Sequence, residues 1–133
     1  MEVREVMRSN AGSIRVNDTV LEATREMKRH NISVVPVYDG ADLIGMITDW
    51  DVAVGCVAEG RQPEDCLVRD YMEPDPVCIG PEEDVEHALK LMGVYNVRRL
   101  WVVEDGRTIG LVAIGDVAMR GLEASAYCQG AYC

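Results

Sequence analysis

The apolar residues of this chain recur at two spacings, one typical of helices and one typical of strands. In the stretch from Thr19 to Arg29, Val20, Ala23 and Met27 follow the i, i+3, i+7 spacing of a helix that buries one side. Thr19 followed by Glu22 fits a capping box, in which each side chain satisfies a backbone N–H at the helix start. This stretch is therefore predicted to be a helix.

Short β-branched runs lie on both sides of this helix. Residues Ile32 to Val37 and Leu43 to Thr48 predict the two strands of a hairpin, and a strand is expected around Ser13 to Val16. A second helix is predicted to begin at Asp51 and to end near Gly60, because glycine is a common C-terminal stop. The expected order of elements is strand, helix, strand, strand, helix.

The chain contains this pattern twice. When it is shifted by 65 positions, residues 3 to 53 align with 68 to 118 without a gap, and 14 of the 51 pairs are identical. Ordinary composition would give about three or four identities by chance. The heptapeptide GMITDWD, residues 45 to 51, returns as GLVAIGD, residues 110 to 116. We conclude that the sequence is an internal duplication.

The second copy predicts the same elements, at Cys78 to Gly80, Asp84 to Val94, Val97 to Val103, Thr108 to Ala113, and from Asp116 onward. A three-stranded sheet with helices on one face leaves its other face apolar, so the pair is expected to be the folding unit. The predicted class is α/β (α+β), a pseudo-twofold pair of repeats. The expected domains are 1–60 and 68–124, with a polar linker at 61–67 and a tail at 125–133.

Composition and charge narrow the class of partner. Of the 133 residues, 48% are hydrophobic and none is phenylalanine, which predicts a soluble globular protein with an aliphatic core. The net charge of -10 repels phosphate backbones and anionic membrane surfaces, so neither nucleic acid nor a membrane is an expected partner. A small phosphorylated ligand stays possible, because it needs only a local positive potential.

Motifs of targeting, metal binding and catalysis are not found. No signal peptide or membrane-spanning run is visible, and a cytoplasmic protein is expected. The five cysteines lack zinc-ligand spacing and are interpreted as reduced thiols, although Cys128 and Cys133 in the tail could form an intermolecular disulfide. No P-loop, nucleophile–base pair or metal-ligand spacing is present, so the protein is predicted not to be an enzyme and to need no cofactor.

The arrangement resembles the CBS domain pair, often called a Bateman module. The residues that carry the resemblance are the lead-ins VREVM and VRDYM, the helices after NDTV and EEDV, the strands ISVVPVYDG and VRRLWVVEDG, and the closing GMITDWD and GLVAIGD. It covers residues 3 to about 122. The resemblance implies a regulatory module that binds AMP, ADP, ATP or S-adenosylmethionine in a cleft between the repeats.

The resemblance also implies site residues. In the family the motif Asp accepts ribose hydroxyls and the motif Thr or Ser contacts phosphate, which assigns Asp51 and Thr48 in the first copy, with Gly45 allowing close backbone approach. The second copy has Gly110 and Asp116, but Ala113 replaces the hydroxyl residue. The first-copy site is therefore expected to be the better equipped. The alternative is that each aspartate is simply a helix N-cap and Thr48 a strand residue.

Two further features separate the copies. Arg98 and Arg99 stand where the first copy has Ser33 and Val34, and the family commonly places basic residues there to reach a phosphate; they could equally be solvated surface charges. Trp101 replaces the family's proline, and we favour core filling over adenine stacking.

The protein is expected to associate with a second copy of itself. The resemblance implies a homodimer assembled through helices, with apolar positions at Val52, Val54, Val57, Val117 and Met119, and Trp50 as a further candidate contact or a residue at the cleft rim. A client protein could bind differently to the ligand-bound and ligand-free forms. Alternatively, the pair is degenerate and serves as a structural dimerisation or interaction module without ligand.

Overall fold

The computed structural model describes residues 1–10 and 12–123, which form two compact units. The first-repeat unit comprises Asn10–Pro76, and the second-repeat unit comprises Met1–Ser9 together with the chain from Val77 onward. The predicted tail, with Cys128 and Cys133, lies outside the described residues.

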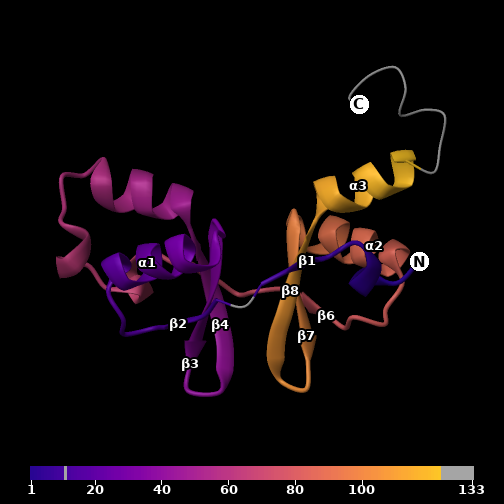
Figure 1. Ribbon diagram of the computed structural model, residues 1–133, viewed down its shortest axis with the longest axis horizontal. Helices are drawn as coiled ribbons and strands as arrows, with labels where there is room; N and C mark the ends of the chain where they lie inside the picture. The colour runs from indigo at the N-terminus through magenta and orange to yellow at the C-terminus, as the bar shows by residue number, and fades with distance from the viewer. Residues whose placement is uncertain (11, 124–133) are drawn as a thin grey trace. The chain divides into compact units, whose positions relative to one another are not determined.

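The first-repeat unit is a four-stranded sheet covered by helices on one face (Figure 1). Its sheet order is β2-β3-β4-β5, with β2 parallel to β3 and the other neighbours antiparallel. The elements in chain order are β2 (Ile14–Arg15), α1 (Val20–His30), β3 (Val34–Asp39), β4 (Asp42–Thr48), the π-helix η2 (Asp51–Val57), the 3-10 turns η3 (Pro63–Asp65) and η4 (Val68–Asp70), and β5 (Glu73–Pro74).

The second-repeat unit repeats this architecture with the sheet order β1-β8-β7-β6. Its elements are η1 (Val3–Glu5), β1 (Arg8–Ser9), β6 (Cys78–Ile79), α2 (Val85–Tyr95), β7 (Arg99–Glu104), β8 (Arg107–Ala113) and α3 (Ile114–Glu123). The mixed α+β class and the duplicated order of elements are confirmed. The predicted three-stranded sheet is wrong in both units, because a two-residue strand adds a fourth.

The boundaries of α1 and α2 follow from local chemistry. The Thr19 hydroxyl accepts the Glu22 N–H at 3.1 Å, and the Asp84 carboxylate accepts the Glu86 N–H at 2.9 Å. Both helices end at an asparagine in the left-handed conformation, Asn31 and Asn96, each with φ 53°. Asparagine is one of the few residues that adopts this conformation at low cost, which explains its identity in both copies.

The extra strands belong to lead-in segments that the two repeats have exchanged. Residues 3 to 9 begin the first repeat in sequence, yet Val3 is fully buried in the core of the second-repeat unit and β1 pairs with β8. Val68 is buried likewise in the first-repeat unit, where β5 pairs with β4. The compact units therefore divide the chain at Ser9 and Pro76 rather than at the repeat boundaries.

The backbone hydrogen bonds of the lead-ins obey the 65-residue repeat. Val3 N–H donates to the Glu83 carbonyl at 2.8 Å, and Val68 N–H donates to the Asp18 carbonyl at 2.9 Å. The segment predicted as a polar linker is also part of this packing. Cys66 is 5% exposed within the aliphatic core, and its carbonyl accepts the Val20 N–H at 2.8 Å.

Candidate functional site

The GMITDWD motif closes β4 and starts the following helix with a reciprocal capping box. Thr48 N–H donates to Asp51 Oδ2 at 2.9 Å, and Asp51 N–H donates to the Thr48 hydroxyl at 3.1 Å. Thr48 is the last residue of β4 and is 3% exposed, while Asp51 is partly buried. The spacing of three residues is what allows each side chain to satisfy the other's backbone donor.

This geometry corrects the predicted helix start. Helical structure begins at Asp49, two residues earlier than expected, and then continues as η2. Asp51 is therefore the third helical residue and reaches back toward the strand, and Thr48 is the residue that caps the helix. The N-cap reading of Asp51 is wrong, and the reading of Thr48 as a plain strand residue is incomplete.

The second motif keeps only half of the capping box. Asp116 is the third residue of α3, and its Oδ2 accepts the Ala113 N–H at 3.1 Å. Since Ala113 has no hydroxyl, its side chain cannot accept the Asp116 N–H. The N-cap reading is thus wrong for Asp116 as well.

The two aspartates also differ in charge environment. Asp116 Oδ1 forms an ion pair with Arg8 Nε at 2.9 Å, and Arg8 comes from β1, the exchanged lead-in. The repeat equivalent of Arg8 is Glu73 in β5, which cannot pair with a carboxylate. Within the described part of the chain, Asp51 takes part in no ion pair. Asp116 therefore has a cationic partner that Asp51 lacks among the described residues.

The close packing of β5 and β1 explains why the two motifs need glycine at positions 45 and 110. A Cβ atom at Gly45 would lie 2.5 Å from the Glu73 carbonyl oxygen, and one at Gly110 would lie 2.8 Å from the Arg8 carbonyl oxygen. Contacts this short with backbone atoms leave room for glycine alone. The close backbone approach expected at Gly45 exists, and the partner that the structure shows there is β5.

The predicted basic residues lie beside the second motif. Arg99 is paired in register with Ala113, and the Arg98 carbonyl accepts the Ile114 N–H at 2.9 Å. Both arginines are exposed, and neither side chain has a hydrogen bond or ion pair among the described residues. The structure thus brings Gly45, Thr48 and Asp51 together in one unit, and Gly110, Asp116, Arg98 and Arg99 together in the other.

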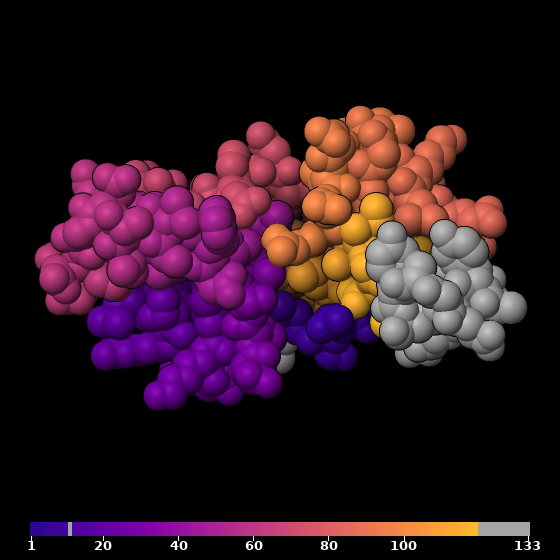
Figure 2. Space-filling model, turned by 90° about the horizontal axis from the view of Figure 1, so that it is seen from above, coloured from indigo at the N-terminus to yellow at the C-terminus, as the bar shows by residue number. Residues whose placement is uncertain are grey.

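Some of the tryptophans and apolar helix residues singled out in the sequence are buried, and others are exposed to solvent. Trp101 is 1% exposed, which agrees with core filling, and its Nε1 has no hydrogen-bond partner in residues 1–10 and 12–123. Trp50 is 71% exposed and directly precedes η2 in the chain. Figure 2 shows the surface of η2 in magenta. Among the predicted contact positions, Val54, Val57 and Met119 are exposed, whereas Val52 and Val117 are core residues and the expectation for them is wrong.

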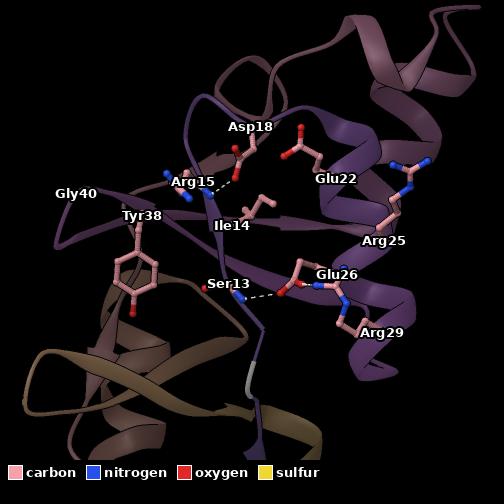
Figure 3. A pocket seen from close by; sticks show the side chains of 10 residues that line it. All are labelled: Ser13, Ile14, Arg15, Asp18, Glu22, Arg25, Glu26, Arg29, Tyr38 and Gly40. Carbon is pink, nitrogen blue, oxygen red and sulfur yellow. Dashed lines mark hydrogen bonds and ion pairs between the residues drawn. The ribbon is translucent and has the colours of Figure 1, made fainter.

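A hollow that the sequence did not indicate lies over α1 and β2 in the first-repeat unit. It has a volume of about 640 Å³ and is lined by charged side chains of both signs. Figure 3 shows that Ser13 N–H contacts Glu26, at 3.2 Å, and that Arg15 N–H contacts Asp18, at 2.9 Å. None of the predicted site residues lines it. The polar residues that α1 contributes to this hollow lie on the side of the helix opposite its buried residues. In the sequence they cannot be distinguished from the residues of an ordinary solvated helix face.

The described helices include none that is long and apolar enough to span a membrane. The groups of His, Cys, Asp and Glu in the same residues include none with the geometry of a metal site.

Curated proteins are similar to this chain over most of its length. The curated relatives include the CBS domain-containing protein YhcV of Bacillus subtilis, 34% identical over 89% of this chain and 84% of its own length. They also include an inosine-5'-monophosphate dehydrogenase of Korarchaeum cryptofilum, 42% identical over 77% of this chain but only 21% of that enzyme.

Solved structures match over almost the whole chain. The CBS domain pair of protein MJ0100, in complex with 5'-methylthioadenosine and S-adenosyl-L-methionine, is 25% identical, with a TM-score of 0.71 over 91% of this chain and 99% of that one. A hexameric CBS-CP12 protein from bloom-forming cyanobacteria gives a TM-score of 0.76 at 25% identity over 90% and 67%. The family model of the CBS domain matches twice, at residues 3–55 and 68–123. This chain belongs to the CBS domain family and contains two CBS domains in tandem.

Proposed function

We propose that the protein is a non-catalytic regulatory module that binds an adenosine-containing ligand at the first-repeat motif, with Gly45, Thr48 and Asp51 as its core. The observation that carries the proposal is the difference between the two aspartates. Asp51 is held by a complete capping box and forms no ion pair within the described residues, whereas Asp116 is paired with Arg8.

The chemistry of Asp51 suits a ribose. An ionised carboxylate accepts hydrogen bonds only, and it can accept from two adjacent hydroxyl groups, as acidic residues do in dinucleotide folds. The capping box fixes the orientation of this carboxylate without using a charged partner, so its negative charge is available to a ligand. The adenosyl ligands in the MJ0100 complex support the same class of ligand for this chain.

The remaining predicted site residues fit an anionic group on the ligand. Arg98 and Arg99 are exposed and unpaired among the described residues, and we propose that they provide positive charge for a phosphate-bearing ligand at the second-repeat motif, beside which they lie. Gly110 and Asp116 form the weaker site, because Ala113 lacks the hydroxyl and Arg8 occupies the carboxylate. AMP, ADP, ATP and S-adenosylmethionine are the candidate ligands.

A second candidate function is that of a structural dimerisation or interaction module without ligand. It is favoured by the half-formed second motif and by the exposed apolar residues Trp50, Val54 and Val57, which follow one another at helical spacing. Such a cluster is typical of an interaction surface. We propose self-association as a homodimer, with a client protein as a further partner, under either function.

The two functions are separated by ligand-induced stabilisation. Protein freed of nucleotide is heated with S-adenosylmethionine, AMP, ADP, ATP or NAD, and Asp51→Asn is compared with its repeat-matched control Asp116→Asn. A ligand at 100 times its Kd stabilises the folded state by about 2.7 kcal/mol. We expect a rise in melting temperature with at least one adenosine compound, lost in Asp51→Asn and kept in Asp116→Asn. No shift with any compound, for a protein that is folded and dimeric, would favour the structural module.

A further inference from the structure

Two cysteines of the first-repeat unit lie side by side without being bonded. Cys56, in η2, and Cys66, after η3, have their sulfur atoms 3.6 Å apart. A disulfide has a length of about 2.05 Å, so the two sulfurs would need to approach by about 1.5 Å. The two positions are ten apart in sequence, and both belong to the same hydrophobic core.

The two thiols differ in access to solvent. Cys66 is 5% exposed and lines a surface hollow of about 590 Å³, together with Arg61 and Tyr71. Cys56 is completely buried, and this burial raises the pKa of its thiol above the ordinary value. A small oxidant that enters the hollow would therefore meet Cys66 first and would reach Cys56 only through it.

A side chain that lines the hollow forms a hydrogen bond with the Cys66 sulfur. The Tyr71 hydroxyl donates to Cys66 Sγ at 3.3 Å, and this contact raises the pKa of Tyr71. The tyrosine ring can lie here because residue 55 is glycine: a Cβ at Gly55 would be 2.9 Å from Tyr71 Cδ1. Arg61 lines the same hollow, together with the acidic residues Glu59, Asp65 and Asp70.

We infer that Cys56 and Cys66 form a reversible disulfide, in which Cys66 reacts with a peroxide and Cys56 resolves the product. The Cys66 thiolate attacks one peroxide oxygen, the O–O bond breaks, and a sulfenic acid and one hydroxide are formed. The Cys56 sulfur then attacks the Cys66 sulfur, the S–O bond breaks and a second hydroxide leaves. The hydroxides take up the two thiol protons as water, so two thiols are oxidised by two electrons and the peroxide is reduced. A dithiol reductant reverses the change.

The bond would join η2 to the segment that leads into η4 and β5. Asp51 stands in the first turn of η2, five residues before Cys56. Oxidation would thus link η2, which carries Asp51, covalently to the lead-in that contains η4 and β5. The remaining described cysteine, Cys78, is exposed on β6 of the other unit and serves as an internal control.

Trypsin places the two cysteines in separate peptides, because Arg61 lies between them and Arg69 follows them. The full-length protein is treated with hydrogen peroxide while folded, its free thiols are alkylated, and it is digested without reductant. We expect peptides 30–61 and 62–69 to be linked at least tenfold more abundantly than either is linked to the Cys78 peptide, 70–90, and the link to disappear with dithiothreitol. Absence of this link, or equal linkage to the Cys78 peptide, would overturn the inference.

The order of attack is tested with a trap for sulfenic acids. In Cys56→Ser, peroxide and dimedone should label Cys66; in Cys66→Ser, position 56 should stay unlabelled. The control Cys78→Ser should keep the link of wild type. Labelling of Cys56 at least equal to that of Cys66 would overturn the assignment of roles. The wild-type peptide map does not depend on these variants, so a variant that fails to fold leaves the main test intact.

Discussion

Replacing Thr48 by valine tests whether the motif threonine has a structural role besides any contact with ligand. Valine has nearly the same shape, so the substitution removes the hydroxyl and little else. The Asp51 N–H then loses the acceptor that it has at 3.1 Å, in a site where Thr48 is 3% exposed. The Asp51 side chain would still accept the N–H of residue 48, so half of the capping box should survive.

The expected loss of stability follows from that single contact. Removal of a helix cap costs about 1 kcal/mol, and a partly buried donor without a partner costs about 1–3 kcal/mol. The two figures describe the same lost hydrogen bond, so we expect about 1–2 kcal/mol in total. For 133 residues this corresponds to a fall of about 3–7 °C in melting temperature.

Urea denaturation without ligand, followed by far-UV circular dichroism, measures this loss. Thr24→Val is the matched control, because the Thr24 hydroxyl donates to the Leu21 carbonyl inside α1 and caps nothing. We expect the control to change the free energy of unfolding by less than about 0.5 kcal/mol. If both variants had the stability of wild type, the capping account of the motif threonine would be refuted.

Gly45, Arg8 and Cys56 each lead to a further testable expectation. Gly45→Ala should destabilise the protein by at least about 1–3 kcal/mol, because its Cβ would lie 2.5 Å from the Glu73 carbonyl oxygen; Gly93→Ala, in open space on α2, should be stabilising by about 0.5–1 kcal/mol in the same urea titration. Arg8→Ala should cost less than about 1 kcal/mol, since the Arg8 side chain is 80% exposed, and raising the salt concentration should shrink the difference from wild type. Burial raises the pKa of Cys56 above its ordinary value of 9.0, so the unfolded chain loses the thiol proton first. The free energy of unfolding of the reduced protein should therefore fall as pH rises through about 9, and fall less in Cys56→Ser; an equal fall in both would contradict this assignment.

Elements with a local signal could be predicted from the sequence. The helix over Val20 to His30 carries its apolar spacing and its cap within a dozen residues, and β3 and β4 carry a β-branched pattern on both sides of a turn. The 65-residue repeat then provided a second reading of each element. Agreement between two copies is what makes the period readable in so short a chain.

Elements that depend on distant pairing could not be predicted. The strands β1 and β5 have two residues each, which is too short for a period of two to be visible. Their partners, β8 and β4, lie far away in sequence, so the exchange of lead-ins leaves no local trace. The start of the helix after β4 differs from the prediction for another reason. Aspartate is common both at the N-cap and at the third position of a helix, so the sequence alone does not decide which of the two Asp51 occupies.

The exchange of lead-ins explains how two copies of one motif can diverge in function. Each motif is packed against a segment that the duplication placed next to the other copy, Glu73 beside Gly45 and Ser9 beside Gly110. A substitution in a lead-in therefore alters the motif of the opposite repeat. In the second motif, Arg8 forms an ion pair with Asp116, and Ala113 has no capping hydroxyl. In the first motif, Glu73 stands at the position of Arg8, and the Thr48 hydroxyl completes the capping box with Asp51. One difference in each of two pairs of equivalent positions, 8 with 73 and 48 with 113, is enough to turn a symmetric duplication into one motif whose aspartate is held by a complete capping box and one motif whose aspartate is ion-paired.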